Sequence, residues 1–550
     1  MSDPRTFPEA FQRTVAAYPG KLALRTPGDE ITYTWREYGD AVHRIAGGFA
    51  ALGVGHGDTV AAMLTNRPEF HLTETAASHL GATTFSIYNT NPAEQIRYLL
   101  DHSGAKLVVT ERQFLDAIKS SGTVVEHIVV VDDGDLDRLP QPDPAFDFEA
   151  AWRAVEPADV LCMIYTSGTT GKPKGVEHTH EGMFTLGTRI ASVLPMREDD
   201  TTISYLPAAH AADRGWSHYF AMWFGYQVTD VADPAQLPAA ILELHPTTLG
   251  AVPRTWEKFK MAVDAQLGAD PQLAAALAAG VPEVAAAVRA RLGLDRLRWS
   301  LTGAAPIATE VFDFLRRLDI PISEVWGMSE CGLGTAVSPA QSRLGTVGKA
   351  LPGVELRTGA DGELLMRAKN LMRGYRNDPA KTAEAIDAEG WLHTGDLAHI
   401  DDDGYVRIIG RKKELIINAA GKNMSPGNIE NAIVVGSPLI GSVIAIGDRR
   451  PYNVALITLD PEIAPRFAAD LGLAADPAVL AADERVHHAI AAAVEAGNAK
   501  LARVEQVRKF TVLPVFWLPG GDELTPTLKL KREPIAAKYA AEIDALYQGW

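Results

Sequence analysis

The sequence has few cysteines, no long apolar run and fewer basic than acidic side chains. Its two cysteines, Cys162 and Cys331, are too few to form a zinc cluster, and free buried thiols are typical of a reducing cytosol. No stretch of about 18 apolar residues occurs, so we expect no membrane-spanning helix. Acidic residues outnumber lysine and arginine by 69 to 52, and this balance argues against a nucleic-acid partner, which requires a basic face.

The two ends of the sequence lack the patterns of common targeting signals. The first residues have no apolar core of the kind found in secretory signals, and residues 548–550 do not form a peroxisomal address. We therefore expect a cytoplasmic protein whose contact with a membrane is at most peripheral. A length of 550 residues exceeds what one hydrophobic core usually supports, so we expect at least two domains.

Helix-like and strand-like segments alternate along much of the chain. The helix-like segments include 42–52 and 69–80, and the strand-like segments include 59–64, 106–110 and 127–131. Such alternation predicts an α/β fold with largely parallel sheets. An Ala-rich stretch at 262–292, interrupted by proline and glycine, predicts two or three surface helices.

The most informative stretch is a loop that combines glycines, hydroxyls and lysines. It follows an apolar, strand-like run at 160–164 and contains Thr166, Ser167, Gly168, Thr169, Thr170, Gly171, Lys172 and Lys174. Glycines allow backbone N–H groups to turn toward an anion, and the hydroxyls and lysines add donors and positive charge. The loop therefore suits a polyphosphate, the alternative being a polar surface loop. A standard P-loop is not predicted, because Pro173 replaces the Ser or Thr that binds magnesium.

The loop and four later motifs resemble one enzyme superfamily. Residues 165–175 resemble the phosphate loop of the AMP-forming acyl-CoA synthetases, luciferases and peptide-synthetase adenylation domains. The later motifs, in the same order as in that superfamily, are Trp326-Gly-Met-Ser-Glu330, Gly390-Trp-Leu-His-Thr-Gly-Asp396, Gly410-Arg-Lys-Lys-Glu-Leu-Ile416 and Pro526-Thr-Leu-Lys529. The resemblance implies a large multi-layer N-terminal domain with parallel sheets at 1–410. It also implies a small, mobile α+β C-terminal domain at 411–550, with Lys413 at the pivot.

The resemblance also implies a site for ATP and Mg²⁺. The loop would hold the β- and γ-phosphates, Asp396 and Arg411 the ribose hydroxyls, and Glu330 the magnesium ion. Residues expected near the adenine, the ribose or the α-phosphate are Gly303, Ala304, Ala305, Trp326, Gly327, Met328, Ser329 and Ile408. Trp326 replaces the tyrosine or phenylalanine that most members carry as the wall against adenine.

Two further residues are expected to act on the acid. The resemblance makes Lys529 the catalytic cation, although Lys531 lies close by and Leu528 replaces the glycine that is common before this lysine. His210 matches a histidine near the acyl carboxylate, so we predict His210, Glu330 and Lys529 as the catalytic set.

The sequence after His210 and the segment at 419–426 concern the acyl group and its acceptor. Aromatic residues at 216, 219, 220, 223 and 224 have helical spacing and predict one apolar face, which either packs in the core or lines an acyl pocket. Gly421 and Asn423 resemble the loop that forms the tunnel for the pantetheine arm of coenzyme A.

These features predict an acyl-CoA synthetase that uses ATP, Mg²⁺ and coenzyme A. A carboxylic acid, fatty or otherwise hydrophobic, would form acyl-AMP with release of pyrophosphate, and the acyl group would then pass to the thiol of coenzyme A. Several segments resemble the long-chain branch. Alternatives are a ligase that loads a carrier-protein thiol, a non-catalytic acyl or nucleotide binder, and a luciferase-like oxygenase. A homodimer is left open.

Overall fold

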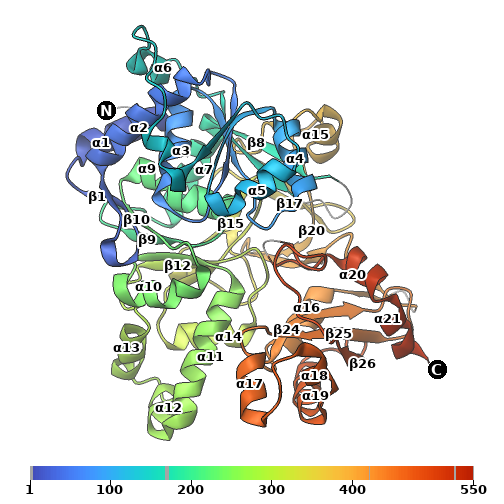
Figure 1. Ribbon diagram of the computed structural model, residues 1–550. Helices are drawn as coiled ribbons and strands as arrows, with labels where there is room; N and C mark the ends of the chain where they lie inside the picture. The colour runs from blue at the N-terminus through green and yellow to red at the C-terminus, as the bar shows by residue number, and fades with distance from the viewer. Residues whose placement is uncertain (1–3, 167–171, 420–421, 526–527, 549–550) are drawn as a thin grey trace.

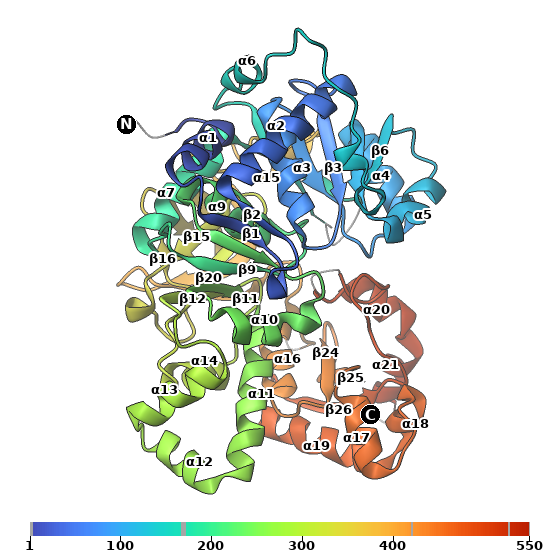
Figure 2. The same ribbon diagram turned by 60° about the vertical axis from the view of Figure 1, so that its left-hand side comes forward.

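The computed structural model describes residues 4–166, 172–419, 422–525 and 528–548. Figures 1 and 2 show a large lobe, coloured from blue to yellow, and a smaller orange and red lobe built from the last part of the chain. The α/β architecture with parallel sheets that the sequence predicts is confirmed, together with its division into a large and a small part.

The main sheet of the large lobe has seven strands in the order β19-β8-β7-β4-β3-β5-β6. Their bounds are β3 Thr59–Met63, β4 Thr83–Ser86, β5 Ala105–Thr110, β6 His127–Val130, β7 Val160–Thr166, β8 Lys174–Thr179 and β19 Gly374–Tyr375. Strands β7, β4, β3, β5 and β6 run parallel, whereas β8 and β19 run antiparallel to their neighbours. Helices α1 (Phe7–Ala17), α2 (Trp35–Ala51), α3 (Pro68–His79), α4 (Ala93–Ser103), α5 (Arg112–Ser120), α6 (Phe148–Arg153) and α7 (His180–Val193) belong to this region.

Two further sheets, parallel except for the β1–β2 pair, belong to the large lobe. One is ordered β2-β1-β10-β9 and the other β11-β12-β13. Their bounds are β1 Leu22–Arg25, β2 Thr32–Thr34, β9 Thr201–Ser204, β10 Gln227–Asp230, β11 Thr248–Ala251, β12 Trp299–Thr302 and β13 Ile322–Glu324. Helices α10 (Leu237–Leu244) and α14 (Thr309–Arg317) accompany them.

The Ala-rich stretch forms helices, as predicted. They are α11 (Pro253–Ala269), α12 (Pro271–Ala278) and α13 (Pro282–Arg291), which project downward in green in Figure 1. Within the described ranges no single helix is long and apolar enough to cross a membrane. Only α12 and α13 taken together, bent by 119°, meet the criteria of length and composition.

An antiparallel region between residues 326 and 411 carries two of the motifs and the first residues of a third. One sheet is β14-β15-β16 and the other β17-β18-β20-β21. Their bounds are β14 Trp326–Met328, β15 Gly332–Ala336, β16 Lys349–Ala350, β17 Glu355–Thr358, β18 Glu363–Arg367, β20 Leu392–Ile400 and β21 Val406–Arg411, and α15 (Pro379–Ala385) lies between β19 and β20 in the chain. In the β20–β21 hairpin, Asp396 is directly opposite Arg411.

The small lobe combines a mixed sheet, β24-β25-β26, with helices and a short β22-β23 ladder. The strands are β22 Ile416–Ile417, β23 Asn423–Met424, β24 Ile440–Ile446, β25 Asn453–Leu459 and β26 Val507–Val512. The helices are α16 (Pro426–Val434), α17 (Ala464–Leu471), α18 (Pro477–Ala482), α19 (Glu484–Asn498), α20 (Arg532–Lys538) and α21 (Ala540–Tyr547). A separate hydrophobic core, which includes Ile429, Ile457 and Ile490, lies between these elements.

Ion pairs join the two lobes where α11 meets the segment that follows β25. Arg254 lies 2.6 Å from the carboxylate of Asp460, and Lys258 lies 2.8 Å from that of Glu462. The first pair is mostly buried, and the second is exposed to solvent. Any rotation of the small lobe relative to the large one must therefore break charged contacts on this side.

The aromatic segment after His210 includes a π-helical turn, whereas its residue spacing predicts a regular α-helix. Residues Ala211–Asp213 form α8, Arg214–Tyr219 form one turn of π-helix (η4), and Phe220–Phe224 form α9. The π-helical turn changes the angular spacing of these side chains from that of a regular α-helix. Trp216 packs edge-on against Trp299, and Trp223 packs edge-on against Phe184. The aromatic side chains are therefore part of the main core, which is the first of the two predicted roles.

A buried histidine makes the stability of the large lobe depend on pH. His180 is 2% exposed, and its Nδ1 accepts a hydrogen bond of 3.1 Å from the backbone N–H of Phe7. Burial lowers the pKa of His180 to about 3, although nearby Asp159 opposes the shift. The native state therefore binds fewer protons than the unfolded chain between this value and the ordinary histidine pKa of about 6.5, and stability falls as the pH falls through this interval.

We expect His180 alone to lower the free energy of unfolding by about 2 kcal/mol between pH 7 and pH 5. Urea unfolding of the large lobe at both pH values measures this loss. The variant His180→Gln is expected to be less stable at pH 7 but to lose less stability on acidification. An unchanged dependence on pH in the variant would contradict the assignment.

Candidate active site

The predicted phosphate loop joins the antiparallel strands β7 and β8, and Thr166 lies opposite Lys174 at its base. This strand–loop–strand arrangement differs from the strand–loop–helix of P-loop enzymes, in agreement with the sequence. The ammonium group of Lys174 lies 3.9 Å from the ring centroid of Tyr375, and that of Lys172 lies 5.2 Å from the ring centroid of Tyr98. Residues Ser167, Gly168, Thr169, Thr170 and Gly171, which we predicted as phosphate ligands, lie outside the described residues.

Glu330 is held in a buried turn beside this loop. It is 8% exposed, and its Oε1 accepts a hydrogen bond of 2.8 Å from the hydroxyl of Tyr375. The backbone of the turn is fixed as well, because the Met372 N–H donates to the carbonyl of Glu330 and His178 Nε2 lies 2.7 Å from the carbonyl oxygen of Ser329. The carboxylate thus has a defined orientation next to Lys174, whose pKa burial lowers and Glu330 raises.

Trp326 and Asp396 contact each other directly. The indole Nε1–H of Trp326 donates a hydrogen bond of 2.8 Å to Asp396 Oδ2, and Arg411 Nε lies 2.7 Å from Asp396 Oδ1. Both Trp326 and Asp396 are buried, whereas the Arg411 side chain is about half exposed. Burial raises the pKa of Asp396, and Arg411 and Trp326 oppose that shift.

Two backbone positions in the predicted adenine region have demanding geometry. A Cβ atom at Gly327 would lie 2.2 Å from the carbonyl oxygen of Gly332, so only glycine fits there. Ala304, between Gly303 and Ala305 in the turn after β12, has φ of 67°, a left-handed conformation that is rare without glycine or asparagine. Ala304 and Ala305 are exposed, and strained backbone of this kind is often found at ligand sites.

Lys529 reaches from the small lobe toward this group of residues. It keeps contact with solvent, yet burial lowers its pKa, and Arg411 lowers it further. The carboxylates of Asp396, Glu414 and Glu330 act in the opposite direction. The charged residues predicted to bind the ribose and the metal therefore act electrostatically on the side chain of Lys529.

Lys531, the other lysine considered from the sequence, points elsewhere. Its ammonium donates a hydrogen bond of 2.8 Å to the carbonyl of Gly521 within the small lobe. This contact fixes the turn that carries Lys529. The ammonium group of Lys531 is therefore bound within the small lobe, and this contact distinguishes it from Lys529.

The residue before Lys529 explains why glycine is common at that place in related sequences. Leu528 has φ of 62° and is 50% exposed, in a turn where its N–H donates to the carbonyl of Thr525. A left-handed conformation strains a side chain with a Cβ atom by about 1–2 kcal/mol.

We expect Leu528→Gly to raise the free energy of unfolding of the small lobe by up to about 1 kcal/mol, since glycine relieves the strain but increases the entropy of the unfolded chain. Denaturant unfolding followed by tryptophan fluorescence measures the difference. Leu518→Gly is the control, because Leu518 is similarly exposed and has no positive φ. A loss of stability at both positions would argue against strain at Leu528.

His210 lies at the start of α8, within the electrostatic range of Lys529. Its Nδ1 accepts a hydrogen bond of 3.2 Å from the N–H of Ala212. Burial lowers the pKa of His210 to about 4, and the charge of Lys529 contributes in the same direction. The imidazole is therefore neutral at pH 7, with Nε2 protonated and able to donate a hydrogen bond to an acid oxygen.

Some predicted residues are placed only in part. Ile408 is partly buried across the hairpin from Ala398. The backbone of Asn423 belongs to β23, but its side chain and the whole of Gly421 lie outside the described part of the chain.

The sequence did not indicate Tyr375 or His178, which hold the Glu330 turn. Both come from the edge of the main sheet, far from Glu330 in the chain, and neither belongs to a motif used above. The Gly-Tyr pair at 374–375 could have indicated a contact with Glu330 only if the pairing of β19 with β8 had been known.

The residues around Glu330 fit a magnesium ion that shares its ligands with phosphates. Carboxylate oxygen is a ligand that Mg²⁺ prefers, and Glu330 offers one beside the loop. No group of three or more His, Cys, Asp or Glu side chains suited to a metal is present in the ranges that the structure describes. The protein would thus supply one carboxylate ligand to the magnesium ion, and the phosphates of the nucleotide would supply the remaining negative charge.

Comparison with known proteins identifies the family. The model of the AMP-binding enzyme family matches residues 11–376, and that of the AMP-binding enzyme C-terminal domain matches residues 413–550. The putative fatty-acid–CoA ligase FadD11 of Mycobacterium tuberculosis is 50% identical over 433 residues, which cover 73% of this chain and 76% of that protein. The long-chain-fatty-acid–CoA ligase FadD15 of Mycobacterium bovis is 34% identical over 94% of this chain and 92% of its own.

Solved structures show the same fold. The anthranilate CoA ligase AuaEII, in complex with anthranoyl-AMP, superposes with a TM-score of 0.77 over 98% of both chains at 20% identity. The chain belongs to the AMP-binding enzyme family. It is an AMP-forming acid–thiol ligase that uses ATP, Mg²⁺ and coenzyme A.

Proposed function

We propose that this ligase activates fatty acids or other hydrophobic acids and that the residues around Lys529 carry out the adenylation. The relatives FadD11 and FadD15 are named as fatty-acid–CoA ligases, which supports this class of acid. The observation that carries the proposal is that Asp396 is held by Trp326 and Arg411, and Glu330 by Tyr375, while the charges of Arg411, Asp396 and Glu330 all act on the pKa of Lys529.

The side chains divide the work of the first half reaction. The carboxylate of Asp396 accepts hydrogen bonds from the ribose hydroxyls, while Trp326 and Arg411 hold this carboxylate in place. Lys174 and the glycine-rich loop bind the β- and γ-phosphates, and Mg²⁺, when bound through Glu330, neutralises phosphate charge. Such a reaction depends mainly on positioning and on charge stabilisation, because the protein forms no covalent bond with the phosphorus atom.

Lys529 acts where the new bond forms. The acid carboxylate attacks the α-phosphorus, the P–O bond to the β-phosphate breaks, and pyrophosphate leaves. An ammonium group between the carboxylate and the α-phosphate reduces the repulsion between these two anions. Neutral His210 donates a hydrogen bond that orients the carboxylate without competing for the proton of Lys529.

In the second half reaction the thiol of coenzyme A attacks the acyl carbon and AMP leaves. We place the domain boundary at 410/411 and the pivot at Lys413. Rotation of the small lobe about this pivot would remove Lys529 from the active site and bring in the segment that contains Gly421 and Asn423. The separate core of the small lobe supports such a movement as a unit. The ion pairs Arg254–Asp460 and Lys258–Glu462 would then stabilise the adenylating arrangement.

We also propose a cytoplasmic location. Cys162 and Cys331 are both buried free thiols, and burial raises the pKa of Cys162 to about 11. Unpaired cysteines of this kind suit a reducing compartment.

Release of pyrophosphate from a panel of acids tests the function. The panel contains straight-chain acids of increasing length, aromatic acids and sterol-derived acids, each with and without coenzyme A. We expect release with hydrophobic straight-chain acids and a multiple-turnover rate that depends on coenzyme A. Turnover with none of the acids would refute the proposed substrate class, and a requirement for a carrier protein in place of coenzyme A would favour the carrier-loading alternative.

A further inference from the structure

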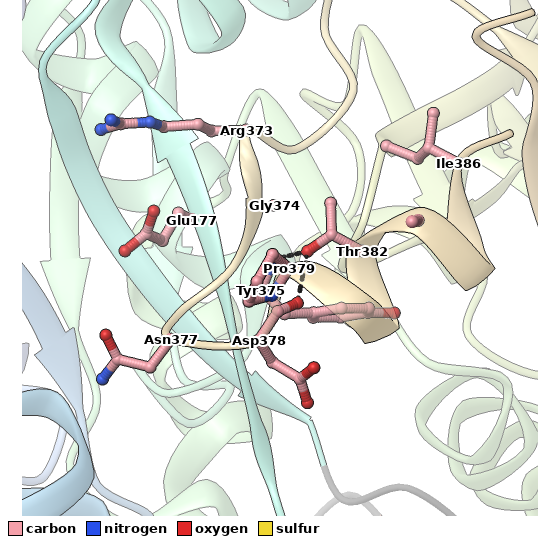
Figure 3. A pocket seen from close by; sticks show the side chains of 10 residues that line it. Glu177, Arg373, Gly374, Tyr375, Asn377, Asp378, Pro379, Thr382 and Ile386 are labelled. Atoms are coloured by element: carbon pink, nitrogen blue, oxygen red, sulfur yellow. Dashed lines mark hydrogen bonds between the residues drawn. The ribbon is translucent and has the colours of Figure 1, made fainter. Parts of the chain in front are cut away.

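Tyr375 lies at the edge of the main sheet, beside the strand that leaves the phosphate loop. It belongs to β19, where it pairs with Val176 of β8. Its own N–H donates a hydrogen bond of 2.9 Å to the hydroxyl of Thr382 in the middle of α15. Figure 3 shows Tyr375 and Thr382 together in the lining of an open cavity, near Asp378. The backbone of Tyr375 is thus anchored on two sides.

The side chain of Tyr375 contacts two residues of the proposed site at once. Its hydroxyl donates to Glu330 Oε1 at 2.8 Å, and its ring centroid lies 3.9 Å from the ammonium of Lys174. The side chain is 7% exposed, so water competes little for either contact. A phenol is protonated at neutral pH and therefore serves as a donor to the carboxylate.

We propose that Tyr375 is a positioning residue that orients the metal-binding carboxylate of Glu330 and the phosphate-binding ammonium of Lys174 toward the same nucleotide. This inference rests on the proposed function of the site. The phenol donates to one carboxylate oxygen of Glu330, and the opposite oxygen would be available to bind a metal ion. The π-face attracts the ammonium and limits the directions in which this flexible side chain can extend.

An ordinary packing role is the competing explanation. Tyr375 also contacts a small apolar cluster that includes Val176, Met372 and Ile386. Packing depends on the ring alone, however, whereas the contact with Glu330 depends on the hydroxyl. The variant Tyr375→Phe removes the hydroxyl and keeps the ring, and Tyr375→Leu removes both.

Manganese binding provides a readout that does not require catalysis. Mn²⁺ is titrated in the presence of α,β-methylene-ATP, which cannot form the adenylate, and free Mn²⁺ is followed by electron paramagnetic resonance. We expect Tyr375→Phe to weaken Mn²⁺ binding about tenfold, as befits the loss of one hydrogen bond to a charged group, with little change in thermal unfolding. Tyr375→Leu is expected to weaken binding of the nucleotide as well, because Lys174 loses its contact.

The control is Tyr38→Phe, which removes a buried hydroxyl that donates to the carbonyl of His71, away from the site. Its Mn²⁺ affinity is expected to equal that of the unmodified protein. Equal affinity in Tyr375→Phe, or an equal loss in Tyr38→Phe, would overturn the inference. Failure of the proposed function would give a different result. In that case no acid in the pyrophosphate panel would react, but the unmodified protein and Tyr375→Phe would still differ in Mn²⁺ affinity.

Discussion

The variant Lys529→Ala is expected to form acyl-AMP about a thousandfold more slowly than the unmodified enzyme, because it loses the cation that separates two anions in the transition state. Exchange of labelled pyrophosphate into ATP in the presence of the acid measures this step. The second half reaction, started from supplied acyl-AMP and coenzyme A, is expected to proceed at a near-normal rate. The variant thus separates the two half reactions.

Lys531→Ala is the matched control for Lys529. The two lysines are two residues apart, but Lys531 donates to the carbonyl of Gly521 and lies in a structural turn. We expect this variant to keep most of its pyrophosphate exchange and to lose some stability. Normal exchange in Lys529→Ala, or loss of exchange only in Lys531→Ala, would show that the wrong lysine has been assigned.

The variant Asp396→Asn is expected to raise the KM for ATP by about a hundredfold. A carboxylate that binds two hydroxyls contributes about 1.5–3 kcal/mol for each hydrogen bond, and an amide presents only one oxygen for the same contacts with Trp326 and Arg411. Steady-state kinetics at saturating acid and coenzyme A give the KM. Binding of AMP, measured by calorimetry, is expected to weaken by a similar factor.

The stability of Asp396→Asn distinguishes a binding role from a structural one. Burial raises the pKa of Asp396, so the folded protein disfavours the charge, and a neutral side chain at this place removes that penalty. We therefore expect the melting temperature to change by only a few degrees. The control is Asp361→Asn, in which an exposed carboxylate loses its pair with Lys412 in the same sheet region. A normal KM for ATP in Asp396→Asn would refute the ribose assignment.

Local sequence was sufficient for the elements and for most of the chemistry. The glycine and hydroxyl content of residues 166–174 predicted an anion loop, and its departure from the P-loop pattern agrees with the hairpin formed by β7 and β8. The hairpin that places Asp396 opposite Arg411 closes at the Asp-rich turn of residues 401–404. The hairpin pairings are confirmed because they depend on neighbours in the chain, where residue type limits the backbone directly, whereas the binding of an anion by the loop stays a prediction.

The contacts that orient the site could not be predicted in the same way. The hydroxyl of Tyr375 and Glu330 are 45 residues apart in the chain, and they meet only because β19 joins the edge of the main sheet. The indole of Trp326 was predicted to stack on adenine, and its hydrogen bond to Asp396 depends on how two antiparallel sheets pack together. The π-helical turn at 214–219 replaced the expected regular helix in a segment where Arg214 is paired with Glu74 in the core.

The sequence by itself determined the reaction class, because its five motifs resemble, in the same order, those of one adenylating superfamily. Only the tertiary structure decided which of two neighbouring lysines faces that site and which side chains direct the carboxylates. The physical reason is that residue type sets the charge and hydrogen-bonding capacity of a group, whereas the direction in which the group acts depends on contacts between segments distant in the chain.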